Sequence, residues 1–200
     1  SPIAHVALTP NGSVLLSVDA RGNCLVVSMA TGKDVGRFTF RSPVTALKFS
    51  PNSDYLLLSL GRSVELWQTP QVHHKQFSPF QKICSYDGAF DDVVTLDWSS
   101  DSEFFIAGSR DLTSRIYALH PKKGFVRGRL GGHRDFLVAS AFDGKDKRIV
   151  YTVSRDGRFA RWVWKHDPEI KARRAERERQ GVAEEEEAHI LERGSEDEEV

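Results

Sequence analysis

Short apolar runs separated by polar turns recur along the first 166 residues of the chain. Val44–Phe49 and Val93–Trp98 alternate between apolar and polar positions, which is typical of strands with one buried face. Tyr55–Leu58 and Phe104–Ala107 are continuous apolar runs, as expected of short strands buried on both faces. The pattern predicts strands near residues 4–8, 14–18, 24–28, 35–40, 44–49, 55–59, 63–67, 80–85, 93–98, 104–108, 114–118, 125–130, 137–142, 149–153 and 159–164.

These strands fall into four similar segments. The third apolar run of each segment ends in a bulky residue, and the spacings between these residues are 40, 50 and 45; they are Val27, Trp67, Tyr117 and Trp162. A period near 40–45 residues with four short strands per unit is the pattern of a β-propeller blade. Asn11-Gly12 and Asp156-Gly157 supply residues that tolerate the positive φ of tight hairpin turns. We therefore predict an all-β fold: a partial WD-repeat β-propeller of four consecutive blades whose ring is not closed.

The expected domain organisation is four blades followed by a charged tail. The blades span about 1–41, 42–88, 89–131 and 132–166, and the last of them lacks its outer strand. Asp167-Pro168 resembles a helix start, but the segment 167–200 contains the acidic runs Glu184–Glu187 and Glu196–Glu199 and few apolar residues. We expect this tail to be a solvated insertion or linker, largely disordered or helical.

Charge is segregated along the chain although the formal net charge is zero, with 28 basic and 28 acidic residues. The tail has a net charge of −7 and the blades have +7. No apolar run reaches the roughly 18–20 residues of a membrane-spanning helix, the first residues do not resemble a signal peptide, and two cysteines form no disulfide framework. We expect no membrane partner and a reducing compartment. The start without Met and the charged end indicate part of a longer protein.

His133, Thr152 and Asp156 supply an imidazole, a hydroxyl and a carboxylate within one segment. As a nucleophilic triad they would predict hydrolysis, but a triad needs an exposed nucleophile beside an oxyanion site, and no nucleophile-elbow motif is present. Their order, followed by Trp162, matches the structural tetrad of WD-repeat blades, in which indole, hydroxyl, imidazole and carboxylate bond in series. Each group would cost about 1–3 kcal/mol if buried unpaired. We therefore predict a structural tetrad of His133, Thr152, Asp156 and Trp162, and no catalytic residue. No phosphate-binding loop or metal-ligand spacing is present, so we expect no cofactor, metal or small-molecule substrate.

Basic residues concentrate in the third and fourth blades. They form either a surface that binds RNA or a partner, or the ordinary charged surface of a soluble β protein. Charge alone gives binding without sequence preference, so it does not identify a particular RNA. The candidate residues are Lys122, Lys123, Arg127, Arg129, Arg134, Arg155, Arg158 and Arg161.

Several stretches resemble one particular family, the periodic tryptophan protein 2 family. The similarity covers roughly residues 1–165, including the long loop after Trp67, and it rests on Val44–Pro51, Gly61–Arg62, Glu65–Pro70, Lys75–Phe80, Ser109–Ile116, Gly132–Phe136 and Tyr151–Gly157. The sequence departs from the tetrad pattern in the third blade, where Ala89 stands at the His position and Tyr117 at the Trp position.

The resemblance implies a role as well as a fold. It implies that the chain comes from a WD-repeat subunit of the UTP-B subcomplex, which belongs to the small-subunit processome. Such a subunit has two propellers, and the chain would be part of the first. The acidic tail would be an insertion between two strands of the fourth blade. The expected function is a non-catalytic scaffold in ribosome biogenesis that supports pre-rRNA processing and small-subunit assembly in the nucleolus of the nucleus. The expected partners are other WD-repeat subunits of UTP-B, pre-rRNA and a small nucleolar ribonucleoprotein. The alternatives are a WD-repeat adaptor of another complex, such as a ubiquitin-ligase substrate receptor or a chromatin adaptor, and hydrolysis through His133 and Thr152.

Overall fold

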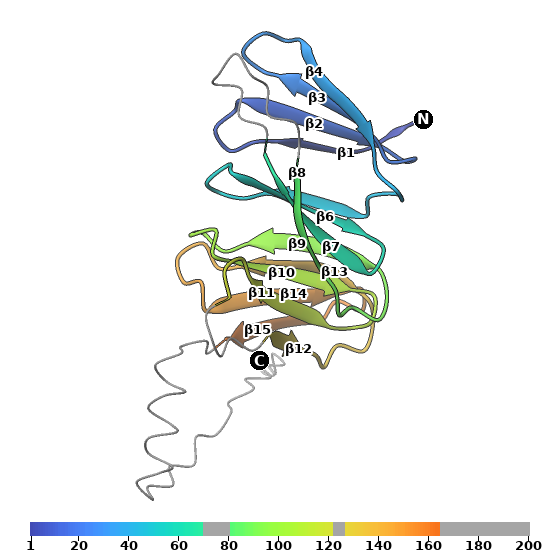
Figure 1. Ribbon diagram of the computed structural model, residues 1–200. Coiled ribbons are helices and arrows are strands. Elements are labelled where there is room, and N and C mark those ends of the chain that lie inside the picture. Colours follow the sequence, from blue (N-terminus) through green and yellow to red (C-terminus); the bar gives the residue numbers. More distant parts are fainter. Residues whose placement is uncertain (70–80, 122–126, 165–200) are drawn as a thin grey trace, which may run out of the picture.

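The computed structural model describes residues 1–69, 81–121 and 127–164, and within them the chain forms four antiparallel sheets (Figure 1). Strands pair in chain order within each sheet. Blade one contains β1 (Ile3–Leu8), β2 (Val14–Asp19), β3 (Asn23–Ser28) and β4 (Asp34–Thr39). Blade two contains β5 (Ala46–Phe49), β6 (Tyr55–Leu60), β7 (Ser63–Gln68) and β8 (Gln81–Tyr86). Blade three contains β9 (Val93–Trp98), β10 (Phe104–Ser109), β11 (Ser114–Ala118) and β12 (Gly128–Leu130). Blade four contains β13 (Leu137–Phe142), β14 (Ile149–Ser154) and β15 (Phe159–Val163).

The predicted all-β fold, with four consecutive blades in a ring that is not closed, is confirmed. In Figure 1 the sheets succeed one another in chain order, with blade one at the top and blades three and four overlapping at the bottom. The fourth sheet has three strands among the described residues. The predicted tail, residues 167–200, lies outside the described part of the chain. The division of the chain into 1–166 and 167–200 therefore stays a prediction.

Two strands differ in extent from the sequence prediction. β5 begins at Ala46 rather than at residue 44. Just before it, Val44 O accepts a bond from His5 of blade one at 2.9 Å, and the Thr45 hydroxyl donates to Val93 O of β9 at 2.5 Å. The Thr45 N–H still donates to Ser59 O, at 3.0 Å. The strand predicted at 125–130 is described only as Gly128–Leu130, since 122–126 lie outside the described residues.

The core lies between successive sheets. Strands β6 and β10 sit in the middle of their sheets and are buried along nearly their whole length, as their continuous apolar sequences require. Leu56 and Leu58 of blade two pack against Val14, Leu16 and Val26 of blade one. Leu57 and Leu66 pack against blade three, and blades three and four share a further cluster that contains Ile106, Ile116, Phe142 and Val150. Each blade is therefore stabilised by its neighbours.

Polar contacts also repeat from blade to blade. The backbone N–H of Asn11 donates to the Ser53 hydroxyl at 3.1 Å, and the N–H of Asn52 donates to the Ser102 hydroxyl at 3.2 Å. Both serines occupy the turn between the first and second strands of their blade, with φ of 65° and 60°. The turn between the first and second strands of one blade thus hydrogen-bonds to a left-handed serine in the equivalent turn of the next blade.

Candidate functional site

A buried chain of hydrogen bonds crosses blade four. The Trp162 indole N–H donates to Thr152 Oγ1 at 2.7 Å, and His133 Nε2 lies 2.7 Å from the same oxygen. His133 Nδ1 lies 3.0 Å from Ser154 Oγ, and the Ser154 hydroxyl donates to Asp156 Oδ1. One direction satisfies every group: indole to Thr152, hydroxyl to the unprotonated Nε2, Nδ1–H to Ser154, and Ser154 to the carboxylate. The chain joins β15, β14 and the loop before β13.

Ser154 changes the predicted order of this chain. The sequence predicted a direct bond between His133 and the turn carboxylate, whereas the structure places the Ser154 hydroxyl between them. Burial lowers the pKa of His133, the opposing field of Asp156 being smaller, which favours the neutral ring that this chain requires. Ser154 has a signal in the sequence: the tripeptide Ser-Arg-Asp occurs at 109–111 and again at 154–156.

The geometry at Thr152 suits a structural role. Its side chain is 1% exposed and its oxygen already has two partners. A hydroxyl in that position cannot reach a substrate, so the arrangement lacks the exposed nucleophile that a triad needs.

Replacement of Thr152 by Val is expected to destabilise blade four by about 1–3 kcal/mol, because it leaves the Trp162 N–H and His133 Nε2 buried without a partner. Hydrogen–deuterium exchange of the full-length protein should show faster exchange in β14 and β15. The exposed Thr31→Val is the matched control and should leave exchange unchanged. Unaltered protection in the Thr152 variant would contradict the structural role.

In blade two a carboxylate accepts the hydrogen bond of the tryptophan indole. Leu58 stands where blade four has Thr152 and offers no hydroxyl, so the Trp67 indole N–H donates to Glu65 Oε2 instead, at 3.0 Å. Glu65 is only 2% exposed, and its other oxygen accepts bonds from Lys82 at 2.5 Å and Arg41 at 2.8 Å. Burial raises the pKa of Glu65, but these three bonds outweigh burial and lower the pKa overall. Sequence reasoning missed Glu65, although an acidic residue inside an apolar run is an available signal.

Phe40 completes the packing around the Trp67 indole. Its ring meets the indole edge to face, with centroids 5.8 Å apart, in the place where blade four has His133 beside Trp162. Edge-to-face aromatic contacts contribute about 0.5–1.5 kcal/mol beyond the area they bury. Blade two therefore lacks the hydroxyl and imidazole of the tetrad but keeps its aromatic packing.

Blade three uses an ion pair. Arg115 Nη1 and Asp111 Oδ2 form an ion pair at 2.9 Å, and the two side chains are 8% and 7% exposed. Burial raises the pKa of Asp111, but bonds from Thr113, the Phe90 N–H and Arg115 lower it overall. The Tyr117 ring stacks on Phe105, with centroids 5.0 Å apart. Asp111 of blade three thus pairs with a guanidinium, whereas the equivalent Asp156 of blade four bonds to Ser154 and, through it, to His133.

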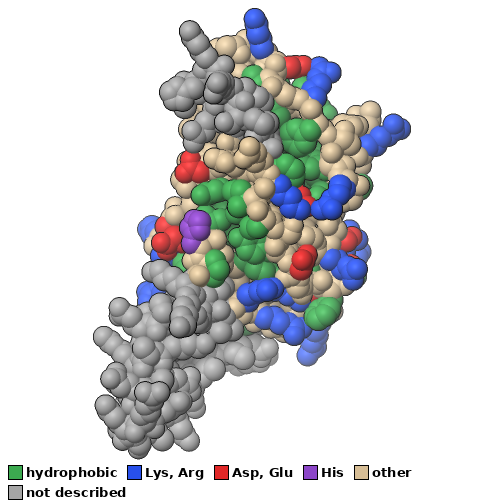
Figure 2. All heavy atoms as spheres, viewed as in Figure 1, with side chains coloured by type: hydrophobic (Ala, Val, Ile, Leu, Met, Phe, Trp, Pro, Cys, Tyr) green, Lys and Arg blue, Asp and Glu red, His purple; other side chains and the backbone are tan. Residues whose placement is uncertain are grey.

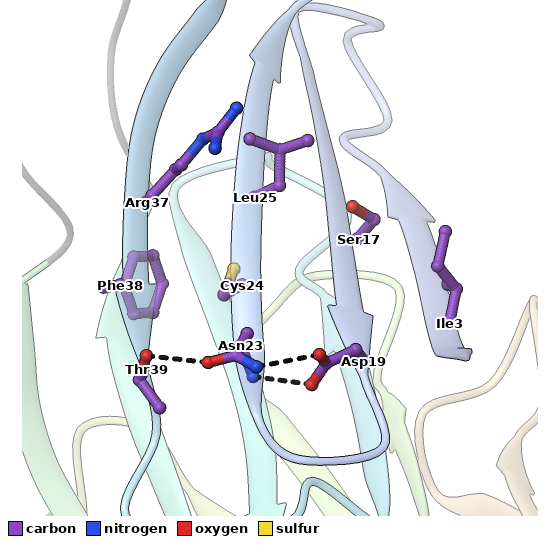
Figure 3. A pocket seen from close by; sticks show the side chains of 9 residues that line it. All are labelled: Ile3, Ser17, Asp19, Asn23, Cys24, Leu25, Arg37, Phe38 and Thr39. Atoms are coloured by element: carbon purple, nitrogen blue, oxygen red, sulfur yellow. Dashed lines mark hydrogen bonds between the residues drawn. The ribbon is translucent and has the colours of Figure 1, made fainter. Parts of the chain in front are cut away.

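Blade one carries a shallow hollow of about 480 Å³ on the side of its sheet that does not face blade two (Figure 3). It is lined by Ile3, Ser17, Asp19, Asn23, Cys24, Leu25, Arg37, Phe38 and Thr39. In Figure 3 the Thr39 hydroxyl, Asn23 and Asp19 form a bonded chain across three strands, so these polar groups are already paired. Burial raises the pKa of the Cys24 thiol to about 12, which keeps it protonated and unreactive. The hollow offers no reactive group.

The predicted basic residues do not form one patch. Arg134, Arg155 and Arg158 lie together, because the Arg155 N–H donates to Phe136 O at 2.8 Å and joins the loop before β13 to the turn before β15. Arg127 and Arg129 lie before and within β12, and Arg161 lies inside β15. Lys122 and Lys123 lie outside the described residues. All six described arginines are exposed.

Two of these arginines already contact the protein. Arg127 donates to Asp87 O at 2.7 Å, and Arg158 lies 3.8 Å from Asp156. Among the described residues, no ion pair or side-chain hydrogen bond involves Arg129, Arg134, Arg155 or Arg161. Arg161 still interacts electrostatically with Asp146, so Arg129, Arg134 and Arg155 are the candidates most available to a phosphate.

The structure adds an observation that the sequence analysis missed. Each turn between the second and third strands of a blade carries an exposed arginine: Arg21, Arg62, Arg110 and Arg155. In Figure 2 the Lys and Arg side chains gather on the right, the side on which the chain passes from one blade to the next in Figure 1. Aspartates at residues 91, 92, 135 and 156 lie among them, so this loop face (the b–c turns and the loops between blades) is rich in charge but close to balanced.

Metal and membrane sites are not evident. In the described ranges, no group of three or more His, Cys, Asp or Glu side chains is placed to hold a metal ion. No described segment forms a helix able to cross a bilayer.

Comparisons with known proteins agree with this geometry. The family model described as "WD domain, G-beta repeat" matches residues 32–68 and 80–117. The crystal structure of RRP9 WD40 repeats superposes with a TM-score of 0.66, over 80% of this chain and 47% of that one. Sequence identity is 19%, so this likeness concerns the fold.

The sequence relatives are more specific. The periodic tryptophan protein 2 homolog of Schizosaccharomyces pombe is 42% identical over 171 residues, which cover 85% of this chain and 20% of the relative. Periodic tryptophan protein 2 of Saccharomyces cerevisiae is 34% identical over 168 residues, covering 83% of this chain and 18% of the relative. The chain thus spans about one fifth of the length of these relatives. Identity at this level over most of the chain, together with WD-repeat blades, shows that the chain belongs to the periodic tryptophan protein 2 family.

Proposed function

We propose that this chain is part of a non-catalytic scaffold in ribosome biogenesis, in the first propeller of a nucleolar small-subunit processome protein. Its partners would be other WD-repeat subunits of the UTP-B subcomplex, with pre-rRNA and a small nucleolar ribonucleoprotein. Membership of the periodic tryptophan protein 2 family supports the proposed role in ribosome biogenesis. A propeller suits scaffolding because its core strands are fixed while its loops and faces vary.

One structural observation carries the scaffold role. The buried polar side chains bond to one another within the blades, as in the Trp162–Thr152–His133 chain and the Glu65 cluster. The exposed charged groups, by contrast, lie in the turns and loops at both edges of the blades, such as Arg155 on the loop face and Lys145 on the opposite face. Such a division stabilises a rigid body and leaves its surface for partners.

The RNA half of the proposal is tested on the loop face of blade four. Replacing Arg134, Arg155 and Arg158 by Ala in the full-length protein should weaken binding to single-stranded RNA and reduce crosslinking to pre-rRNA in cells. Because each phosphate contact contributes about 0.7 to the dependence of log affinity on log salt, loss of three contacts should lower that slope by about 2.

The control removes the same charge from the opposite face of the same blade. Lys145, Lys147 and Arg148, in the turn between β13 and β14, are replaced by Ala, and RNA binding should be unchanged. Equal loss in both triple variants would indicate binding by net charge alone. Unchanged binding in the first would remove these arginines from the proposal.

The scaffold half is tested by affinity purification of the full-length protein and by its localisation in cells. Processome proteins, a small nucleolar RNA and nucleolar fluorescence are the expected results. Recovery of a ubiquitin ligase or a histone-modifying complex instead would contradict the proposal and favour the adaptor alternative.

A further inference from the structure

Phe90 is the most exposed large apolar side chain among the described residues, at 74%. Ile3 and Val6 of β1 and Phe159 of β15 are also exposed, but they belong to the first and last sheets described, each of which has a neighbouring sheet on one side only. Phe90 lies in the loop between blades two and three, and both of these blades are present. The exposure of Phe90 therefore does not result from a missing neighbouring sheet.

Hydrogen bonds fix the loop that presents this ring. The Phe90 N–H donates to Asp111 Oδ2 at 2.8 Å, and Asp111 is itself paired with the buried Arg115. Upstream, Asp87 O accepts a bond from Arg127 at 2.7 Å.

The downstream half of the loop is fixed as well. The Ser109 hydroxyl donates to Asp91 O at 2.9 Å, and the Arg110 N–H donates to Asp92 O at 2.9 Å. A loop held at both ends and in the middle loses little conformational freedom when a partner binds, which favours affinity.

The Arg115 guanidinium lies 5.6 Å from the centroid of the Phe90 ring. Arg115 is 7% exposed, so the ring rests on a cation that is fixed in the blade. Such a contact holds the ring in one orientation while three quarters of it stays in solvent. An exposed aromatic side chain on a fixed support has the properties of a binding hot spot.

We propose that Phe90 inserts into a second protein, one that offers an apolar pocket flanked by lysine or arginine. The charge around Phe90 favours this partner over a nucleic acid: Asp91 and Asp92 follow the ring directly, and the neighbouring Arg110 lies 3.9 Å from Asp92. Asp91 is exposed and pairs with no cation among the described residues, so its carboxylate repels phosphates and attracts a basic rim. This surface is separate from the blade-four arginines of the proposed RNA contact.

The contact is tested by placing the photoreactive analogue p-benzoylphenylalanine at position 90 of the full-length protein in its own cells. Irradiation should give an adduct with a protein, at a segment where apolar residues adjoin lysine or arginine. The same analogue at Met29, an exposed apolar residue in the turn between β3 and β4, is the control and should not give this adduct.

The protein so identified is then purified, and its affinity for variants of the full-length protein is measured. Phe90→Ala should weaken binding at least tenfold, Phe90→Leu should retain most of it, and Met29→Ala should have no effect. Phe90→Ala keeps the backbone bond to Asp111, so hydrogen exchange of the loop should not change. An adduct with RNA, absence of an adduct, or unchanged affinity of Phe90→Ala would overturn the inference. None of these outcomes depends on RNA binding by the arginines.

Discussion

Replacement of Phe105 by Ala is expected to destabilise the packing of blade three by about 3–5 kcal/mol, the usual cost of removing a fully buried aromatic ring. Phe105 is 0% exposed and lies opposite both Trp98 and Tyr117 in the sheet. Its ring also meets Tyr86 of blade two edge to face, with centroids 4.8 Å apart. Alanine would leave a cavity between two blades, because strands that are hydrogen-bonded on both sides cannot move in to fill it.

Hydrogen–deuterium exchange of the full-length protein is the measurement, because it reports the stability of blade three separately from that of the rest of the protein. A loss of 3–5 kcal/mol corresponds to faster exchange in β10 and β11 by roughly two to four orders of magnitude. Phe159→Ala, at a ring that is 61% exposed, is the matched control and should change exchange little. Similar effects of the two variants would show that the Phe105 cluster is not the core of this blade.

Replacement of Glu65 by Ala is expected to destabilise blade two by about 2–4 kcal/mol. The change leaves the Trp67 N–H buried without an acceptor and removes the partner of Lys82, which is 34% exposed. Arg41 is 79% exposed and keeps its hydration, so its bond contributes little. Exchange in β7 and β8 should accelerate, whereas Glu103→Ala, at a largely exposed side chain, should have almost no effect.

Glu65 also gives blade two a sensitivity to acid. Because its pKa is lower in the folded state than its ordinary value of 4.5, its contribution is complete above that value. It is lost as the pH falls below 4.5 and through the lower folded pKa. Protection of β7 and β8 should therefore decline in this range in the natural protein. Glu65→Gln should show a weaker decline, and an equal decline would assign the acid sensitivity to other groups.

The strand pattern was predictable because it depends on local alternation. Runs such as Val93–Trp98 bury one face, and four similar segments follow one another at spacings of 40–50 residues, so strand order and the blade architecture follow from the sequence. The bonds from Thr152 to Trp162 and His133 were also accessible, since these residues occupy the positions expected for a WD-repeat blade. The extent of β5 was less accessible, because Val44 and Thr45, just before it, bond to the neighbouring blades.

Other polar contacts depended on register between strands. Glu65 and Trp67 lie on the same face of β7, but only the pairing of β6 with β7 shows that Leu58 deprives the indole of a hydroxyl. Ser154 became part of the blade-four chain because its side chain points toward His133 across the blade. A linear sequence holds no measure of such distances.

The sequence by itself determined the fold class, the number of blades and the family, because alternation, turn residues and period are properties of neighbouring positions. Only the tertiary structure decided which groups satisfy the buried polar atoms of each blade and which arginines remain unpaired. It also decided that the Phe90 ring stays in solvent on a fixed loop. These outcomes depend on side chains from different strands meeting in space, and burial makes each such meeting favourable or costly.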